Sequence, residues 1–350
     1  MSILGIDHVE FYVADPQAAA ASFCRDWGFT HEGAGDLGDR PGGRSVRLRQ
    51  GSITMLLTAA DSRGHPAAEY VERHGDGVAS IAFRTDDVAK AFEQAVAGGA
   101  RPISAPAFAD RAGGVGQAVV SGFGDVTHRL VQRAGIAAGQ RAGTGPADMF
   151  LALDHVAICL PAGQIDATVR LYRDAFGFAH VFDERIEVNE QAMISKVVQD
   201  GGGAVTFTLI EPDPNRNPGQ IDQFLDSHGG AGVQHLALRT AGIADAVRAL
   251  SARGVRFLAA PPGYYRRLES RLGALAIPAD VLREVNVLAD RDKWGQLFQI
   301  FSRSTHERET FFIELIERRG ALTFGSGNIR ALYEALGEEQ AVKAPTASVD

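Results

Sequence analysis

The feature that most constrains the fold is that the chain repeats itself. Residues 6–11 read IDHVEF, and a related run, LDHVAI, occupies residues 153–158. Both runs are short and rich in the apolar residues that favour a strand. A helix-like stretch follows each run and ends in similar phrases at residues 23–29 and 172–178. Self-similarity across half a chain indicates one structural unit used twice.

The similarity between the halves continues through the later segments. In each half a hairpin-like run is followed by a strand-like run, an alanine-rich amphipathic helix and a closing strand-like run. These segments are residues 48–57, 74–83, 88–97 and 127–133 in the first half and residues 197–210, 229–238, 243–252 and 312–318 in the second. Each half reads strand, helix and three strands, and then the same again. This order predicts an α+β fold built from tandem βαβββ modules.

The domain boundaries follow from the length and from one change of composition. A chain of 350 residues suits two domains, because a single core rarely grows that large. Residues 134–147 are rich in Gly and Ala, which is a linker composition. We predict an N-terminal domain at residues 1–135, a linker at 136–150, a catalytic domain with a C-terminal helix at 151–336 and a flexible tail at 337–350.

Charge and composition exclude several classes of function. The formal net charge is −8 and the sequence has no basic block, so we expect no nucleic-acid partner. No stretch approaches the ~18 consecutive apolar residues of a membrane span, and residues 1–13 lack the pattern of a signal peptide. Two cysteines, Cys24 and Cys159, make no disulfide framework, which favours a reduced, cytoplasmic setting.

Three residues of the second half form a candidate metal-binding set. His155, His235 and Glu314 each lie inside an apolar, strand-like run. Two imidazoles and one carboxylate are the ligands of the facial triad of non-haem iron(II) oxygenases, which leaves coordination positions open. A carboxylate buried among apolar residues needs a cation, and a metal supplies one. We therefore predict an iron(II) site at these three residues.

The first half serves as an internal control for that interpretation. His8 stands where His155 stands in the second half, Ser80 stands in place of the second histidine, and Arg129 in place of the glutamate. A lone buried histidine is more often a hydrogen-bonded core residue than a ligand, and a guanidinium cannot bind a metal. The N-terminal half is interpreted as a copy that kept the scaffold and lost the site, with His8 as a structural residue.

The second half resembles a known family. The matching phrases follow one another in the family's order at residues 219–225, 232–235, 295–301, 312–318 and 324–328. They resemble the α-keto acid dioxygenases that act on 4-hydroxyphenylpyruvate, within the vicinal oxygen chelate superfamily. The match covers most of residues 151–336 and is looser in the N-terminal half. The resemblance implies two open barrel-like domains, Fe(II), an aryl pyruvate such as 4-hydroxyphenylpyruvate, O2 and a homo-oligomer.

Two activities occur in this family, and the sequence is closer to one of them. The 4-hydroxyphenylpyruvate dioxygenases form homogentisate, whereas the 4-hydroxymandelate synthases oxidise the benzylic carbon. The dioxygenases usually have Asn where this chain has Ile210, and Phe where it has Ile329; both replacements resemble the synthases. Losing an aromatic wall and a polar amide would let the substrate ring turn relative to the metal. Drift in a pocket that still hydroxylates the ring is the alternative.

The resemblance also implies a substrate pocket around the metal, with no catalytic residue beyond the ligands. The residues expected to bind substrate are Ser195, Thr208, Ile210, Gln220, Gln234, Gln299, Phe301, Phe312, Phe324, Asn328 and Ile329. Asn328 is expected to fix the C-terminal helix as a lid. Two other functions remain open at this point. One is a small-molecule binding protein of the same fold, for which fold alone is no argument; the other is an extradiol ring-cleaving enzyme.

Overall fold

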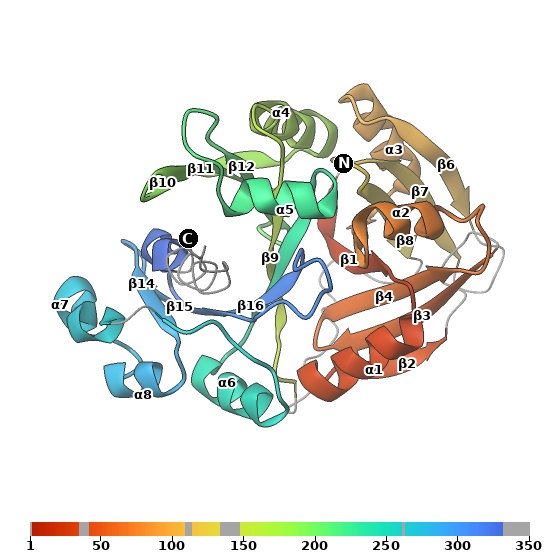
Figure 1. The fold of residues 1–350 in the computed structure, drawn as a ribbon. Coiled ribbons are helices and arrows are strands. Elements are labelled where there is room, and N and C mark those ends of the chain that lie inside the picture. Colours follow the sequence, from red (N-terminus) through yellow and green to blue (C-terminus); the bar gives the residue numbers. More distant parts are fainter. Residues whose placement is uncertain (1, 35–41, 109–113, 134–147, 261–262, 332–350) are drawn as a thin grey trace, which may run out of the picture.

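The computed structural model describes residues 2–34, 42–108, 114–133, 148–260 and 263–331. They form two eight-stranded sheets, one from each half of the chain, which lie side by side in Figure 1. The N-terminal half contains β1 (Ile3–Tyr12), α1 (Pro16–Trp27), β2 (Thr30–Ala34), β3 (Gly43–Gln50), β4 (Ile53–Ala60), α2 (Pro66–His74), β5 (Gly77–Thr85), α3 (Val88–Ala97), β6 (Pro102–Phe108), β7 (Val115–Ser121) and β8 (Thr127–Arg133).

The C-terminal half repeats these elements and adds short helices before its last three strands. It contains β9 (Ala152–Cys159), α4 (Ile165–Phe176), β10 (Ala179–Val188), β11 (Gln191–Gln199), β12 (Thr206–Pro212), α5 (Gln220–His228), β13 (Gly232–Arg239), α6 (Ile243–Ala252), η1 (Tyr264–Arg267), α7 (Leu268–Leu272), α8 (Ala279–Glu284), β14 (Leu288–Arg291), β15 (Gln296–Phe301) and β16 (Phe312–Arg319). Residues 326–331 are helical as well.

The strand orders confirm the predicted repeat and the α+β class. The first sheet has the order β2-β3-β4-β1-β5-β8-β7-β6, and the second has β10-β11-β12-β9-β13-β16-β15-β14. Adding eight to each strand number of the first sheet gives the order of the second, so the two sheets have the same arrangement. In each sheet the central pair β1–β5 or β9–β13 is antiparallel, and the next strand, β8 or β16, runs parallel to its neighbour. Each half therefore places two βαβββ modules around one curled sheet.

Strand register aligns the two halves residue by residue. His8 pairs with Ala82, which pairs with Arg129 on the next strand. In the second sheet, His155 occupies the position of His8, and it pairs with Ala237, which in turn pairs with Glu314. Arg129 and Glu314 are therefore structural equivalents, as the sequence alignment of the halves predicts.

The repeated phrases after the first strand of each half mark helix ends. Asp15 caps α1 by accepting hydrogen bonds from the backbone of residues 17 and 18, and Pro16 begins the helix. Gly28 and Gly177 end α1 and α4 in the left-handed conformation, with φ of 74° and 72°. Glycine adopts this conformation without the strain that a side chain would bring. The aromatic-Gly-Phe motif thus turns the chain, in each half, from the helix into the next strand.

The two halves share one hydrophobic core. Buried residues from both sheets form a single cluster, in which Phe83 packs its ring against Phe176 and Phe207. His128 lies inside this cluster and its Nε2 contacts the hydroxyl of Tyr172 at 2.9 Å. Since α3 and α4 also contact each other, the halves are packed together over a broad, apolar surface.

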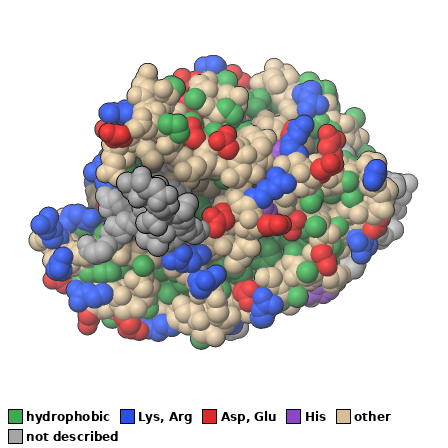
Figure 2. Space-filling model, viewed as in Figure 1, with side chains coloured by type: hydrophobic (Ala, Val, Ile, Leu, Met, Phe, Trp, Pro, Cys, Tyr) green, Lys and Arg blue, Asp and Glu red, His purple; other side chains and the backbone are tan. Residues whose placement is uncertain are grey.

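Several predictions about boundaries and surface remain as predictions. Most of the expected linker, and all of the tail at 337–350, lie outside the described residues. Phe150, at the end of the expected linker, is buried against Trp27. No helix among the described residues is long and apolar enough to cross a membrane. On the face shown in Figure 2, acidic and basic side chains both occur over most of the surface.

Candidate metal centre

Three adjacent strands at the middle of the C-terminal sheet bring the predicted ligands together. His155 is on β9, His235 on β13 and Glu314 on β16. Glu314 Oε2 lies 3.5 Å from His155 Nε2 and 3.3 Å from His235 Nε2. Ligand atoms bound at right angles about 2.1 Å from one ion lie about 3 Å apart, so these spacings suit a shared metal. One ligand atom from each residue lies within 4.8 Å of the other two.

Hydrogen bonds at the far side of each ring direct its Nε2 toward the centre. His155 Nδ1 is 3.0 Å from Asp154 Oδ1, and His235 Nδ1 is 3.3 Å from Gln234 Oε1. Because an oxygen acceptor requires Nδ1 to carry a proton, Nε2 is the nitrogen left to bind a metal, which would displace any proton held there. Arg318 fixes Asp154 in turn, with Nε 2.9 Å from Asp154 Oδ2. The histidines are thus held in the tautomer that metal binding needs.

The carboxylate of Glu314 is buried and already polarised for binding a cation. Glu314 is 1% exposed, and its Oε1 accepts a hydrogen bond from Gln299 Nε2 at 2.8 Å. Burial opposes ionisation of Glu314, yet the two imidazoles lower its pKa to about 2. Burial also lowers the pKa of His155, but Glu314 and Asp154 outweigh burial and raise that pKa to about 9. The ionised Glu314 and the protonated His155 therefore stabilise each other in the metal-free protein, and a bound metal cation would replace the His155 proton beside the carboxylate.

In the N-terminal sheet, Arg129 stands at the position of Glu314 and forms an ion pair with Glu10, which stands at the position of Ala157. Arg129 Nη2 lies 3.3 Å from Glu10 Oε2, and Arg129 Nη1 donates to Gln117 at 2.8 Å. Glu10 is 2% exposed and pairs with Ser80 across β1 and β5. His8 keeps its partner Asp7, which is held by an arginine as in the other half. Here a guanidinium supplies the positive charge that the C-terminal half leaves to a metal.

A cavity opens beside the three ligands, with about 440 Å³ of empty space when the open solvent at its mouth is included. Eight of the residues expected to bind substrate line it together with the ligands. They are Ser195, Thr208, Ile210, Gln234, Gln299, Phe301, Phe324 and Ile329. Met193 lines the cavity too, and sequence reasoning missed it. Strand alternation offered the signal, because residues 193 and 195 of β11 point to the same face.

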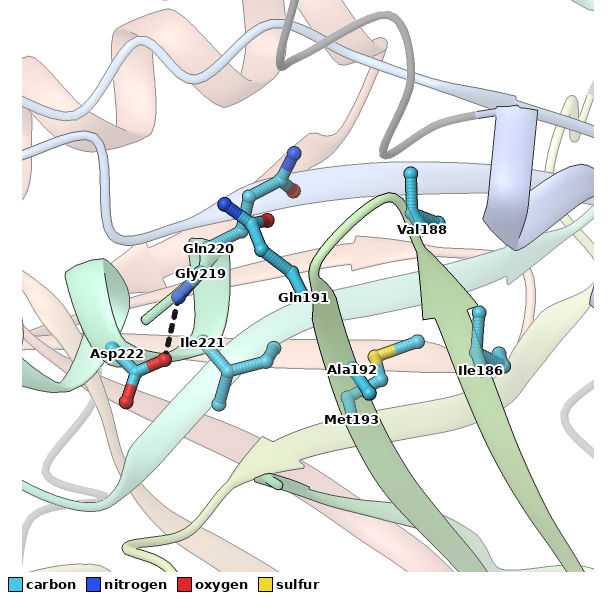
Figure 3. Close-up of a pocket in the computed structure, with 9 residues that line it drawn as sticks. All are labelled: Ile186, Val188, Gln191, Ala192, Met193, Gly219, Gln220, Ile221 and Asp222. Carbon is cyan, nitrogen blue, oxygen red and sulfur yellow. Dashed lines mark hydrogen bonds between the residues drawn. The ribbon is translucent and has the colours of Figure 1, made fainter. Parts of the chain in front are cut away.

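The other three expected residues lie close by in different roles. The Phe312 ring stacks on the His235 ring, with centroids 4.7 Å apart. Asn328 is fully buried behind the cavity wall and donates to Gln299 Oε1. Gln220 lines a second hollow, between the β10–β11 hairpin and the start of α5 (Figure 3). Met193 lines both hollows, so the space near Gln220 adjoins the metal cavity at this residue.

Comparison with known proteins agrees with this architecture. Residues 1–139 match the family model described as hydroxyphenylpyruvate dioxygenase, HPPD, N-terminal, and residues 152–300 match the glyoxalase/bleomycin resistance protein/dioxygenase superfamily. The 4-hydroxyphenylpyruvate dioxygenase of Yarrowia lipolytica is 32% identical over 97% of this chain and 93% of its own. This chain belongs to the 4-hydroxyphenylpyruvate dioxygenase family, within the vicinal oxygen chelate superfamily.

Further members extend the comparison to a solved structure. The 4-hydroxyphenylpyruvate dioxygenase of Dictyostelium discoideum is also 32% identical, over 96% of this chain and 98% of its own. A triple mutant of 4-hydroxymandelate synthase from Streptomyces coelicolor superimposes with a TM-score of 0.86 at 45% identity, covering 97% of this chain and all of that one. The family contains both enzymes, and this chain is similar to each along its whole length.

Proposed function

We propose that this chain is an iron(II)-dependent dioxygenase that converts 4-hydroxyphenylpyruvate and O2 into 4-hydroxymandelate and CO2. The observation that carries the proposal is the buried set of His155, His235 and Glu314 at one wall of a cavity. Three protein ligands on one side leave the opposite side of an ion open for a chelating keto acid and for dioxygen. An iron(II) ion bound there would supply the chemistry that activates O2 as the keto acid loses CO2.

The residues present fit this metal and this substrate. Two nitrogens and one carboxylate oxygen are the donors of iron(II) facial triads. Thr208 Oγ1 is buried at the cavity and has no hydrogen-bond partner among the residues that the structure describes. A buried hydroxyl without a partner is costly, so a polar group of a bound ligand is its natural complement. Phe301 and Phe324 add aromatic walls suited to a phenyl ring.

Some side chains of the cavity are suited to hold the substrate, and others exclude water from the metal site. Phe324 meets the His155 ring edge-on at 5.2 Å, and Phe312 covers the His235 ring, so both ligands are shielded from solvent. Such shielding protects a reactive oxidant from water. The amide of Gln234 lies at the cavity beside His235, and the amide of Gln299 holds the Glu314 carboxylate there. We propose that the chain itself contributes orientation and dryness, with no residue acting as a proton donor or acceptor.

Benzylic oxidation is favoured over ring oxidation by two aliphatic residues at the cavity. Ile210 and Ile329 both line it and leave space on the side where the dioxygenases usually have an amide and an aromatic ring. The 45% identity to a 4-hydroxymandelate synthase, against 32% to the dioxygenases of Yarrowia and Dictyostelium, points the same way. A ring free of those two contacts can turn its benzylic carbon toward the metal.

Product identification tests the proposal. The chain is reconstituted with Fe(II) under anaerobic conditions, mixed with 4-hydroxyphenylpyruvate and O2, and the products are separated by chromatography. We expect 4-hydroxymandelate and CO2 in equal amounts. Homogentisate as the main product would reassign the chain to ring hydroxylation, and binding without O2 uptake would reduce it to a binding protein. Phenylpyruvate assayed alongside tells whether the 4-hydroxyl is needed.

A single substitution sharpens that test. Ile329→Phe restores the aromatic wall at the cavity, and we expect it to shift part of the product toward homogentisate while metal content stays unchanged. Phe301→Leu is the matched change, because it removes an aromatic wall from the same cavity and should lower turnover without altering the product ratio. An unchanged ratio of 4-hydroxymandelate to homogentisate in Ile329→Phe would show that residue 329 does not determine which product is formed.

A further inference from the structure

A chain of hydrogen bonds connects the protein surface to the proposed metal carboxylate. Arg271 Nη2 lies 3.0 Å from the hydroxyl of Tyr264, and that hydroxyl lies 2.9 Å from Asn328 Oδ1. Asn328 Nδ2 donates to Gln299 Oε1 at 2.8 Å, and Gln299 Nε2 donates to Glu314 Oε1 at 2.8 Å. Four consecutive hydrogen bonds thus run from an exposed cation to a buried anion. We call these residues the carboxylate relay.

The carboxylate fixes the direction of every bond in the relay. Because Glu314 can only accept, Gln299 must face it with its NH2 group, and its carbonyl oxygen must face Asn328. Asn328 then presents its own NH2 to Gln299 and its oxygen to Tyr264. The donors therefore all point the same way, and aligned hydrogen bonds polarise and strengthen one another.

The Tyr264 hydroxyl has one proton and two acceptors within reach, Asn328 Oδ1 and the carbonyl oxygen of Ala289, each at 2.9 Å. The hydroxyl accepts from the backbone nitrogen of Ala289 at 2.9 Å and from Arg271. The carbonyl oxygen of Ala289, the other acceptor within reach, also receives Arg271 Nη2 at 3.0 Å. Since Arg271 already donates to the Ala289 carbonyl, donation of the tyrosine proton to Asn328 Oδ1 leaves both acceptors satisfied, and this direction completes the relay at its outer end.

Space for the relay comes from one glycine. Gly325 has φ of 73°, and a Cβ there would lie 2.4 Å from Gln299 Oε1 and 3.3 Å from Asn328 Nδ2. The two amides therefore pass each other only because residue 325 has no side chain. The same glycine turns the chain from Phe324 into the helix at 326–331, which carries Asn328.

Comparison of the halves separates the relay from the shared scaffold. Both halves keep an aspartate that joins the first histidine to an arginine: Asp7 in one, Asp154 in the other. The relay occurs in the second half, where residues 253–287 join α6 to β14 and include η1 and α7. In the N-terminal half, the corresponding connection from α3 to β6 consists of residues 98–101. Gln117, the equivalent of Gln299, contacts Arg129 directly.

We infer that Tyr264 and Asn328 are positioning residues that orient the Glu314 carboxylate through Gln299 and so couple docking of the helix at 326–331 to the metal centre. When this helix is in place, Gln299 is held at both ends and Glu314 keeps Oε2 free for the ion. If the helix leaves, Gln299 Oε1 loses Asn328, and the amide is held by its Nε2 contacts with Glu314 and with the carbonyl oxygen of Phe324 at 3.2 Å. The inference rests on the proposed metal site and adds a part that no ligand residue supplies.

Cobalt(II) titration of the metal-free chain tests the relay without using turnover. The Tyr264→Phe variant keeps the ring and removes only the hydroxyl. We expect its Co(II) dissociation constant to rise about tenfold, the low end of the effect of outer partners of a metal ligand, with a change in the visible d–d absorption. Tyr265→Phe is the matched control, because that neighbouring hydroxyl bonds the carbonyl of Val287 and stands outside the relay. It should leave affinity and spectrum unchanged.

The outcomes separate the relay from the metal site. Equal Co(II) affinity and spectra in Tyr264→Phe and Tyr265→Phe, with tight binding by the parent chain, would overturn the relay alone. Absence of Co(II) binding by the parent chain would instead refute the metal centre. Asn328→Ala provides a second test. Combined with Tyr264→Phe, it should weaken Co(II) binding no further than the stronger single change, since both changes interrupt the same series of hydrogen bonds. Additive losses would contradict the inference.

Discussion

At the middle of the C-terminal sheet stand two imidazoles and a carboxylate, whereas the matching positions of the N-terminal sheet hold an imidazole, a hydroxyl and a guanidinium. The strand order and register around them are the same. In one half, negative charge is concentrated at Glu314; in the other, the Arg129 side chain sits beside Glu10. A buried anion requires a cation in either case. The scaffold therefore tolerates two solutions: a metal can displace the proton of His155 beside Glu314, whereas the guanidinium of Arg129 stays charged and cannot be displaced.

The aspartates that hydrogen-bond the first histidine of each half show which features belong to the shared scaffold. Asp7 and Asp154 hold His8 and His155 in the same way, although only one half has a metal set. Burial opposes ionisation of both aspartates, but their arginine and histidine partners lower each pKa below its ordinary range. An aspartate beside a strand histidine is therefore not evidence of a metal by itself. The partner residues on β13 and β16 make the difference.

The largest expected effect separates Glu314 from its N-terminal equivalent. Glu314→Ala should abolish turnover and weaken Fe(II) or Co(II) binding more than about 100-fold, because a ligand is lost as well as its charge. Arg129→Ala and Ser80→Ala should keep one metal per chain. Metal analysis after anaerobic reconstitution decides this. Metal loss in either N-terminal variant, or full activity in Glu314→Ala, would contradict the division of roles.

A second prediction concerns the stability of the N-terminal half. Arg129→Ala leaves Glu10 buried without its guanidinium, and breaking such a pair costs about 3–5 kcal/mol of the free energy of unfolding. Urea unfolding of the metal-free protein measures this loss. The combination Arg129→Met with Glu10→Gln should recover most of it, since no buried charge remains. Equal instability in the double variant would show that the guanidinium acts through packing rather than charge.

The third prediction concerns the surface where the halves meet. Burial lowers the pKa of His128 to about 4, from an ordinary value of 6.5. The unfolded chain therefore takes up a proton below pH 6.5 that the folded chain refuses until about pH 4, so stability falls with pH across this window. Between pH 7 and pH 5 the loss from this residue is about 2 kcal/mol. The urea midpoints of wild type and His128→Leu should converge as the pH is lowered. Midpoints that change in parallel with pH would show that His128 does not cause this loss of stability.

The smallest and most demanding test rebuilds the missing site. Glu10→Ala, Ser80→His and Arg129→Glu together copy the C-terminal set onto the N-terminal sheet, in matching register. We expect a second Co(II) ion to bind at least about tenfold more weakly than the first, because this half has no carboxylate relay. Titration of the anaerobic protein counts the ions. A stoichiometry that stays at one would show that strand register alone does not make the site.

The ligand set could be predicted from sequence because the chain contains its own comparison. Two of the three aligned positions differ between the halves, and they differ in metal-binding chemistry, so residues far apart in sequence could be grouped by alignment alone. Pocket residues were harder to assign. Gln220 and Gln299 both lie in motif phrases, yet one lines the neighbouring hollow and the other touches Glu314. A motif identifies a segment, whereas side-chain direction depends on how that segment packs.

Sequence by itself determined the repeat, the α+β fold and the chemical identity of the candidate ligands, because periodicity, glycine-ended helices and residue type are local properties of the chain. Tertiary structure decided what lies beside each ligand. Tyr264 and Asn328 come from segments with no counterpart in the N-terminal half, so alignment of the halves gave no sign of them. Their connection to Glu314 exists only because folding brings residues 264, 299, 314 and 328 into hydrogen-bonding distance, and no sequence spacing encodes that contact.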